Sequence, residues 1–276
     1  MMAGVIFVVV TITFFIAHWL PGDPTALWVG SHPTEEQLEV ARKTLGLEES
    51  LGKQYINYIS NIFHGDLGTS LRTKQPITME LSSRFSATFE LVSVSMLLSI
   101  LIAFPLGLIA ALKNNTSIDL IIRGLGYAGL AIPVFWLGMI LQIVFFAWLG
   151  WFPLQGRFST DIYMNTDLII NTGFILFDTF VSGEWALFIN AVHYISLPVI
   201  TMSVAVVGIV IRISKSSLMD TMKEPFFTTL LSFGFSPQKA VTSSAYKNTL
   251  VPVSTIVGLS YGMMLGGTFL IESIFD

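Results

Sequence analysis

The chain has 276 residues, of which 53% are hydrophobic and 12% are charged, and its formal net charge is −4. A soluble domain carries about 25% charged residues, so this composition excludes an ordinary soluble globule and indicates an integral membrane protein. The negative net charge argues against a basic surface that would bind nucleic acid. Because the sequence has no cysteine, disulfides, thiolate metal sites and cysteine nucleophiles are excluded.

Five apolar segments are long enough to cross a membrane. A span needs about 20 mostly apolar residues, because each adds about 1.5 Å through a hydrocarbon layer about 30 Å thick. Internal prolines are tolerated, since neighbouring helices can satisfy the freed carbonyls. We therefore predict an all-α integral membrane protein with about five transmembrane helices. In chain order, the predicted spans are Met1–Leu20, Leu91–Leu112, Leu125–Leu149, Tyr194–Ile211 and Leu250–Ile271.

The loops differ in charge and so predict an orientation. The second-to-third and fourth-to-fifth loops share one side of the membrane, and together they hold seven basic residues against three acidic ones. The positive-inside rule assigns this side to the cytoplasm. The N-terminus is then cytoplasmic and Asp276 is outside. The basic residues of these two loops are Lys113, Arg123, Arg212, Lys215, Lys223, Lys239 and Lys247, against the acids Asp119, Asp220 and Glu224.

The long outer loop predicts a small helical cap. Thr34 precedes Glu35 and Glu36, which is typical of a helix start, and Gly46 is typical of a helix stop. A second amphipathic helix is expected over Leu51–Phe63. We expect three regions: a first transmembrane helix at residues 1–20, an extracytoplasmic loop at 21–90, and a membrane core at 91–276.

A shorter apolar segment, Leu168–Phe180, is interrupted by Asn171 and Asp178. It predicts an interfacial or partly buried segment rather than a span.

Two nucleotide-like patterns do not predict nucleotide binding. Gly124–Gly129 fits G-x-G-x-x-G, but it opens an apolar run instead of following a strand, so close helix packing by small residues is the better interpretation. Gly46–Lys53 has one residue too many for a phosphate loop, and Gln54 replaces the Ser or Thr that would hold magnesium. No catalytic group, metal site or cofactor is predicted within this chain. The four histidines, His18, His32, His64 and His193, are expected to be interfacial or solvated.

Two acids mark the outer ends of predicted spans. Glu90 begins the second span and Glu272 ends the fifth, so each lies where an ionised group costs little. We predict a structural or capping role for both.

The fifth predicted span carries a ridge of small residues. The ridge comprises Gly258, Gly262, Gly266 and Gly267. Glycines four apart either let another helix approach closely or keep a translocation pathway wide, and the sequence leaves both readings open.

The connection between the fourth and fifth spans predicts a short helix after Lys223. Glu224 and Pro225 are typical of the first turn of a helix. Gly234, followed by Pro237, is typical of the end of a helix, and we expect Gly234 to have a positive φ there. The helix is rich in phenylalanine, including Phe226 and Phe227, on a loop that should be solvated. It is either an interfacial amphipathic helix or a helix that docks into a groove of a partner through these phenylalanines.

Several short motifs, in their order and spacing, resemble one family along nearly the whole chain. The sequence resembles the membrane permease subunits of binding-protein-dependent ABC importers in the dipeptide, oligopeptide and nickel group. The matching segments are Leu20–Pro24, Gly65–Ser70, Ser86–Leu91, Phe104–Gly107, Ile132–Gly138, Gly234–Ser236 and Asn248–Pro252.

This resemblance implies a pore subunit in the plasma membrane that moves peptides or related small solutes inward. It implies as partners a second permease, two ATPase subunits that use ATP and Mg, and an external solute-binding protein. The short helix, in the cytoplasmic loop near residues 212–249, would be the coupling helix, and Glu224, Phe226 and Gly234 would belong to its loop.

The chain departs from the family pattern in two ways. First, the stretch Thr228–Phe233 is neither basic nor alanine-rich, as the family's coupling loop usually is. Second, the basic N-terminus and the sixth span of the family are missing, which predicts that the chain is truncated at each end. An ion-coupled secondary transporter is the alternative function, although no repeat or deep intramembrane acid supports it. A membrane-embedded enzyme lacks a paired acid and base within a span.

Overall fold

The structure is a computed structural model that describes residues 2–19, 22, 24–30, 33–164, 166, 171–267 and 269–275. The described residues form helices, with a single isolated β-bridge between Thr69 and Pro76. The chain divides into two compact units, Met1–Arg84 and Phe85–Asp276.

The first unit contains the predicted apolar helix and the cap. The aromatic face of α4 packs on α1, where Phe14 is only 5% exposed and its ring lies 5.2 Å from that of Tyr55. The Thr11 and Tyr55 hydroxyls are 2.8 Å apart. The helices of this unit are α1 (Met2–Trp19), α2 (Pro24–Val29), α3 (Glu35–Thr44) and α4 (Leu51–Phe63).

The predicted boundaries of the first cap helix are confirmed. Thr34 and Gln37 form a capping box, in which each side chain accepts a hydrogen bond from the other residue's backbone amide. Gly46 has φ +67°, and its amide donates to the Lys43 carbonyl, which ends the helix. Leu20, Pro21 and Asp23 of the first family motif, and His32, lie outside the described residues.

The second unit is organised around long helices, two of which exceed their predicted spans. Helix α5 runs over Ile77–Leu112, starting within the first unit, and α10 over Trp185–Thr221, whereas Leu91–Leu112 and Tyr194–Ile211 were expected. Helix α10 has 37 residues, far more than a bilayer requires. The predicted spans thus cover only part of these helices, which extend beyond them at the N-terminal end of α5 and at both ends of α10.

The predicted span Leu125–Leu149 is wrong as a single straight helix. Helix α6 (Ser117–Ala131) stops before Pro133, and the chain beyond it is bent by 99°. Proline lacks an amide hydrogen and pushes the residue before it out of the helical region, and Ile132 has φ −85° and ψ 125°. Prolines 105, 198 and 252 lie inside helices that continue through them.

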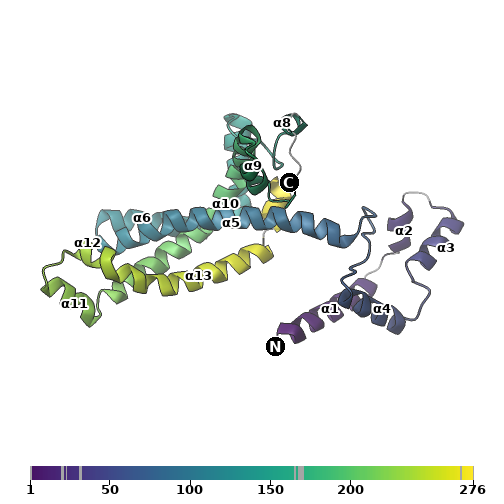
Figure 1. The fold of residues 1–276 in the computed structure, drawn as a ribbon, viewed down its shortest axis with the longest axis horizontal. Helices are drawn as coiled ribbons and strands as arrows, with labels where there is room; N and C mark the ends of the chain where they lie inside the picture. The colour runs from purple at the N-terminus through teal and green to yellow at the C-terminus, as the bar shows by residue number, and fades with distance from the viewer. Residues whose placement is uncertain are drawn as a thin grey trace. The chain divides into compact units, whose positions relative to one another are not determined.

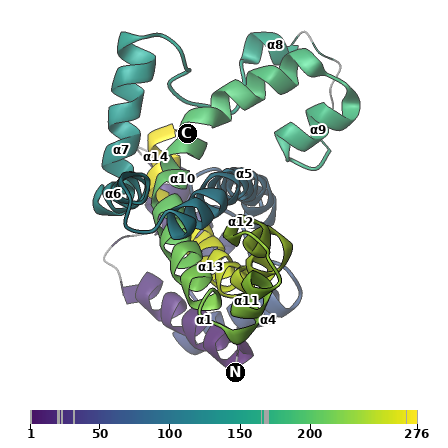
Figure 2. The ribbon, with the colours of Figure 1, turned by 90° about the vertical axis from the view of Figure 1, so that its left-hand side faces the viewer.

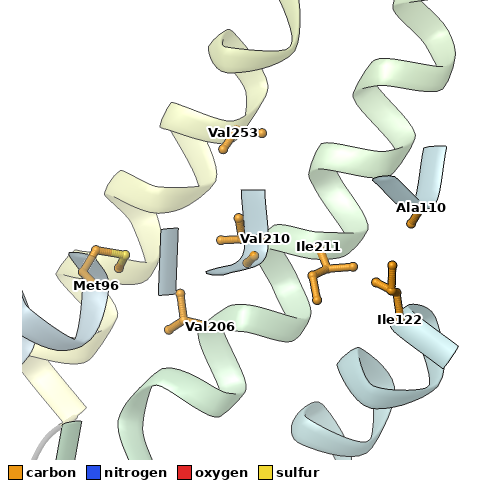
Figure 3. Packing of buried hydrophobic residues seen from close by; sticks show 8 residues of the cluster. Met96, Ala110, Ile122, Val206, Val210, Ile211 and Val253 are labelled. Atoms are coloured by element: carbon orange, nitrogen blue, oxygen red, sulfur yellow. The ribbon is translucent and has the colours of Figure 1, made fainter. Parts of the chain in front are cut away.

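Helix α10 is the centre of the second unit, and it packs against both α6 and α13 (Tyr246–Gly267). Figure 1 shows α5, α6, α10 and α13 running beside one another, and Figure 2 looks along this group from one end. Figure 3 shows the residues of α10 lying between those of α5, α6 and α13. The buried cluster contains Met96, Ala103, Ala110, Ile122, Val206, Val210, Ile211 and Val253.

Glycines permit the closest helix approach in this unit, as expected for the Gly124–Gly129 pattern. A methyl group added to Gly208 of α10 would overlap the Gly126 carbonyl oxygen of α6. A methyl on Gly129 would meet the Val204 carbonyl oxygen at 2.8 Å. The pattern is therefore a helix-packing surface.

The predicted fifth span, Leu250–Ile271, is interrupted. Helix α13 ends at Gly267, and a separate short helix, α14 (Phe269–Phe275), packs on α7 with Phe275 against Gly138. The remaining elements are α7 (Val134–Leu141), the π-helix η1 (Gln142–Trp148), α8 (Thr160–Met164), α9 (Ile175–Ser182), α11 (Pro225–Ser232), α12 (Pro237–Ala240) and the π-helix η2 (Val241–Ala245).

The number of spans depends on how the bent pair is counted. Among the described residues, three helical runs, Ile77–Leu112, Trp185–Thr221 and Pro237–Gly267, are long and apolar enough to cross a membrane. Counting the bent pair Ser117–Trp148 as one span gives four, and Gly4–Trp19 is a shorter apolar helix. Each predicted span has its apolar centre in one of these segments. Part of Leu168–Phe180 lies outside the described residues, and the rest includes α9.

Candidate functional site: the segment between α10 and α13

The short helix expected after Lys223 is present as α11. Glu224 precedes it with an extended backbone, φ −68° and ψ 147°, and Pro225 occupies the first turn. Proline suits this place because its fixed φ is helical and its missing amide hydrogen would have had no partner. The Glu224 side chain is exposed and makes no capping hydrogen bond.

Gly234 ends α11 as predicted, with φ +84°. Its amide donates to the Leu231 carbonyl at 2.9 Å, and the Phe235 amide donates to the Leu230 carbonyl at 3.2 Å. These two bonds form a Schellman motif, which requires a left-handed residue at this point. The direction in which the chain leaves α11 is thus fixed by Gly234.

Phe227 packs inside its own chain, so the prediction that it offers contact area to a partner is wrong. Its side chain is only 3% exposed. It belongs to a buried cluster that joins α11 to α10 and to the start of α13, and Phe226 is partly buried against the same cluster. The buried members of this cluster are Ala111, Leu218, Phe227, Ala240, Val241 and Ala245.

Phe233 is the exposed aromatic residue of the segment, and sequence reasoning missed it. It is 76% exposed, and Leu231 is 39% exposed. At about 100° per residue, six helical positions place Phe233 about 240° around the axis from Phe227. The helical period thus places the two residues on different sides of the axis, but it does not say which side faces inward.

The segment is held at both ends by long helices. On one side α10 leads directly into it. On the other side Ser236 caps α12, where its hydroxyl accepts from the Lys239 amide at 3.3 Å, and the helical run from Pro237 to Gly267 follows. Phe227 shares one buried cluster with Leu218 of α10 and with Val241 and Ala245 of this second run, so α11 packs against both neighbouring helical runs.

The glycine ridge of α13 is not used for packing within the described part of the chain. A methyl group added to Gly258, Gly262, Gly266 or Gly267 would meet nothing within 4 Å. Only 11% of the apolar window of this helix is buried. The ridge is therefore available to another molecule or to a passage, in contrast to Gly126 and Gly208.

An ion pair and several hydrogen bonds connect the segments at the other end of the second unit. Glu90 is 8% exposed, accepts a 2.6 Å hydrogen bond from Arg157 Nη2, and accepts another from the Leu176 amide at 2.7 Å. Arg157 also donates to the Gly173 carbonyl at 2.9 Å. Glu272 accepts from the Thr88 hydroxyl at 2.6 Å. The predicted structural role of both acids is supported, and Arg157 is a partner that the sequence did not reveal.

Comparisons with known proteins agree with these features. A family model described as "Binding-protein-dependent transport system inner membrane component" matches residues 103–276. A second model, for the N-terminal part of such membrane components, matches residues 1–92.

Relatives match over nearly the whole chain. A probable D,D-dipeptide transport system permease protein of Escherichia coli is 36% identical over 97% of this chain and 78% of its own length. A di/tripeptide transport system permease protein of Pseudomonas aeruginosa is 34% identical over 98% and 80%. A glutathione transport system permease protein of Pectobacterium atrosepticum is 32% identical over 98% and 78%.

These matches favour an ABC importer subunit over an ion-coupled secondary transporter. Permeases of this kind work with a solute-binding protein and with separate subunits that hydrolyse ATP. The chain belongs to the family of inner membrane components of binding-protein-dependent transport systems.

Proposed function

We propose that this chain forms half of the transmembrane pore of an importer for peptides or related small solutes. Relatives named for dipeptide, di/tripeptide and glutathione transport support this substrate class. Solute would pass from an external binding protein, through a pore shared with a second permease subunit, to the cytoplasm. Two ATPase subunits would supply the energy through their bound ATP and Mg.

The observation that carries this proposal is the construction of α11. The helix is anchored inward by Phe227, which is buried, and it presents Phe233 outward, which is 76% exposed. Exposed aromatic side chains flanked by polar residues are typical anchors for a groove on a partner. Helix α11 therefore fits the role of a coupling helix that inserts into an ATPase subunit.

The same construction supports a mechanism for coupling. Closure of the ATPase pair would displace α11, and the buried cluster around Phe227 would move the adjoining ends of α10 and α13 with it. Packed interfaces of this kind shift as units rather than deforming continuously. Glu224 and Gly234 set where α11 begins and ends, and Phe226 and Phe227 hold it to the moving helices.

The open face of α13 is proposed to border the translocation pathway. Gly258, Gly262, Gly266 and Gly267 add no side chain there, which leaves room for a peptide backbone or for the second permease. A passage without bulky side chains would leave room for peptides of varied sequence.

Reconstitution of the whole complex tests this function. Proteoliposomes would contain both permeases and the ATPases, with the binding protein and a labelled dipeptide on the binding-protein side. ATP and Mg supplied on the ATPase side should drive dipeptide accumulation, and a protonophore should leave the rate unchanged. Uptake that needs an ion gradient and no ATP would contradict the proposal.

A further inference from the structure

A groove with three basic side chains lies between α6 and α10. Its volume is about 250 Å³, and it is open to the outside at the end of these helices that the positive-inside rule assigns to the cytoplasm. We call it the basic groove. Its lining residues are Arg123, Gly126, Tyr127, Gly208, Ile211, Arg212, Lys215, Ser216 and Met219.

One buried carboxylate accompanies these three cations. Asp119 is fully buried, and its Oδ1 accepts from Lys215 Nζ at 2.6 Å and from Arg123 Nε at 3.1 Å. Its Oδ2 is occupied by the Asn115 amide at 3.0 Å. The three cations therefore exceed the one acid by two charges.

The excess charge is available to a ligand. Arg123 meets Asp119 through Nε, which leaves the two terminal amino groups of its guanidinium for another acceptor, and 38% of its side chain is exposed. Arg212 is exposed, and no ion pair joins it to a carboxylate in the part of the chain that the structure describes. Arginine favours phosphate because its planar donors match two phosphate oxygens at once.

The surface next to the basic groove is apolar. Leu120, Ile121 and Leu125 of α6 are 65%, 61% and 68% exposed. Tyr127 lines the groove and is 52% exposed, with the amphipathic character typical of residues at a membrane interface. A cationic recess beside an aliphatic helix face has the two-part chemistry of a phospholipid.

We propose that the basic groove binds the phosphate headgroup of an anionic phospholipid from the cytoplasmic leaflet. Arg123 and Arg212 donate to the phosphate, and the acyl chains lie along the exposed aliphatic face of α6. The lining of this site includes no residue of α11 or of the glycine face of α13, so it goes beyond the proposed transport function. The bound lipid would cover the crossing of α6 and α10 at Gly126 and Gly208.

Native mass spectrometry of the purified complex tests the site. The complex would be delipidated and then titrated with phosphatidylglycerol, with phosphatidylethanolamine, or with inorganic phosphate alone. Arg123→Gln and Arg212→Gln remove groove cations, and Lys113→Gln removes an exposed cation outside the lining as a matched control. Arg212 has no described ion-pair partner, so this variant removes charge without breaking an internal contact.

The expected result is saturable phosphatidylglycerol binding that weakens about five-fold in each arginine variant and is unchanged in Lys113→Gln. Phosphatidylethanolamine should bind more weakly, and inorganic phosphate should not displace the lipid. Equal phosphatidylglycerol binding by wild type and Arg212→Gln would overturn the proposal. So would equal binding of the two lipids, or displacement of the lipid by free phosphate, which would indicate a site for soluble anions.

Discussion

Arg157 Nη2 lies 2.6 Å from Glu90 Oε2, and this ion pair joins the segment between η1 and α8 to α5. The Glu90 side chain is 8% exposed and that of Arg157 is 35% exposed. Removing one member of such a pair leaves the other charge poorly solvated. The pair therefore holds this end of the second unit together.

Arg157→Ala should lower the free energy of unfolding by about 2–3 kcal/mol, somewhat below the range for a fully buried pair because Arg157 keeps contact with solvent. Thermal unfolding of the purified complex, followed by fluorescence, measures this change. Lys43→Ala breaks the exposed Lys43–Glu39 pair and is the matched control, for which no measurable change is expected. If both variants lost the same free energy of unfolding, the Arg157–Glu90 pair would stabilise the protein no more than an exposed ion pair does.

Gly208→Ala should destabilise the chain by about 1–3 kcal/mol, because the added methyl would overlap the Gly126 carbonyl and force α6 and α10 apart. Gly262→Ala is the control, since a methyl there meets nothing within 4 Å. The thermal unfolding temperature of each purified variant is measured, and only that of Gly208→Ala should be lowered. Equal stability of both variants would contradict close packing at the Gly126–Gly208 crossing.

Gly262→Leu tests the open face of α13. The chain should reach its normal level in the membrane, because the new side chain projects into open space within this chain. Peptide uptake or assembly with the second permease should fail, because the face is proposed to border the pathway. Normal uptake together with normal assembly would contradict the proposal that Gly262 borders the translocation pathway.

The orientation is testable because the chain has no native cysteine. Glu48→Cys in the cap and Ser232→Cys in α11 both replace exposed residues. An impermeant maleimide added to spheroplasts should label position 48 and leave position 232 unlabelled until the membrane is opened. Labelling of position 232 but not of position 48 in intact spheroplasts would contradict the predicted orientation.

Gly234→Val should impair coupling, because φ +84° is costly for a β-branched residue, by about 1–2 kcal/mol or more. The expected result is normal membrane insertion with reduced transport. Gly234→Asn should retain most activity, since asparagine tolerates this conformation better than other residues with side chains. Equal uptake by the valine and wild-type proteins would show that the Schellman motif does not matter for coupling.

Local signals in the sequence predicted helix ends and the apolar centres of the spans well. Thr34, Gly46 and Gly234 behave as expected because capping depends on a few neighbouring residues. The break at Pro133 was not predicted, since Pro105, Pro198 and Pro252 give the same local signal inside continuous helices. Tertiary packing decides which proline bends the chain.

The inward or outward direction of side chains at the candidate site was harder to predict. Phe227 and Phe233 have the same chemistry in one short segment, and only the fold assigns 3% exposure to one and 76% to the other. The pairing of Arg157 with Glu90 spans 67 residues of sequence, and no periodicity reports such a contact.

The docking of α11 is tested most directly by Phe233→Asp. The variant and wild type would be expressed with their partners, and the ATPase retained by the affinity-purified permease would be measured together with dipeptide uptake. Phe63→Asp is the matched control, because Phe63 is 82% exposed and lies at the end of the cap helix α4. The docking proposal predicts normal membrane levels for both variants, with ATPase retention and uptake lost only in Phe233→Asp. Full ATPase retention and uptake by Phe233→Asp would contradict a coupling role for this face of α11.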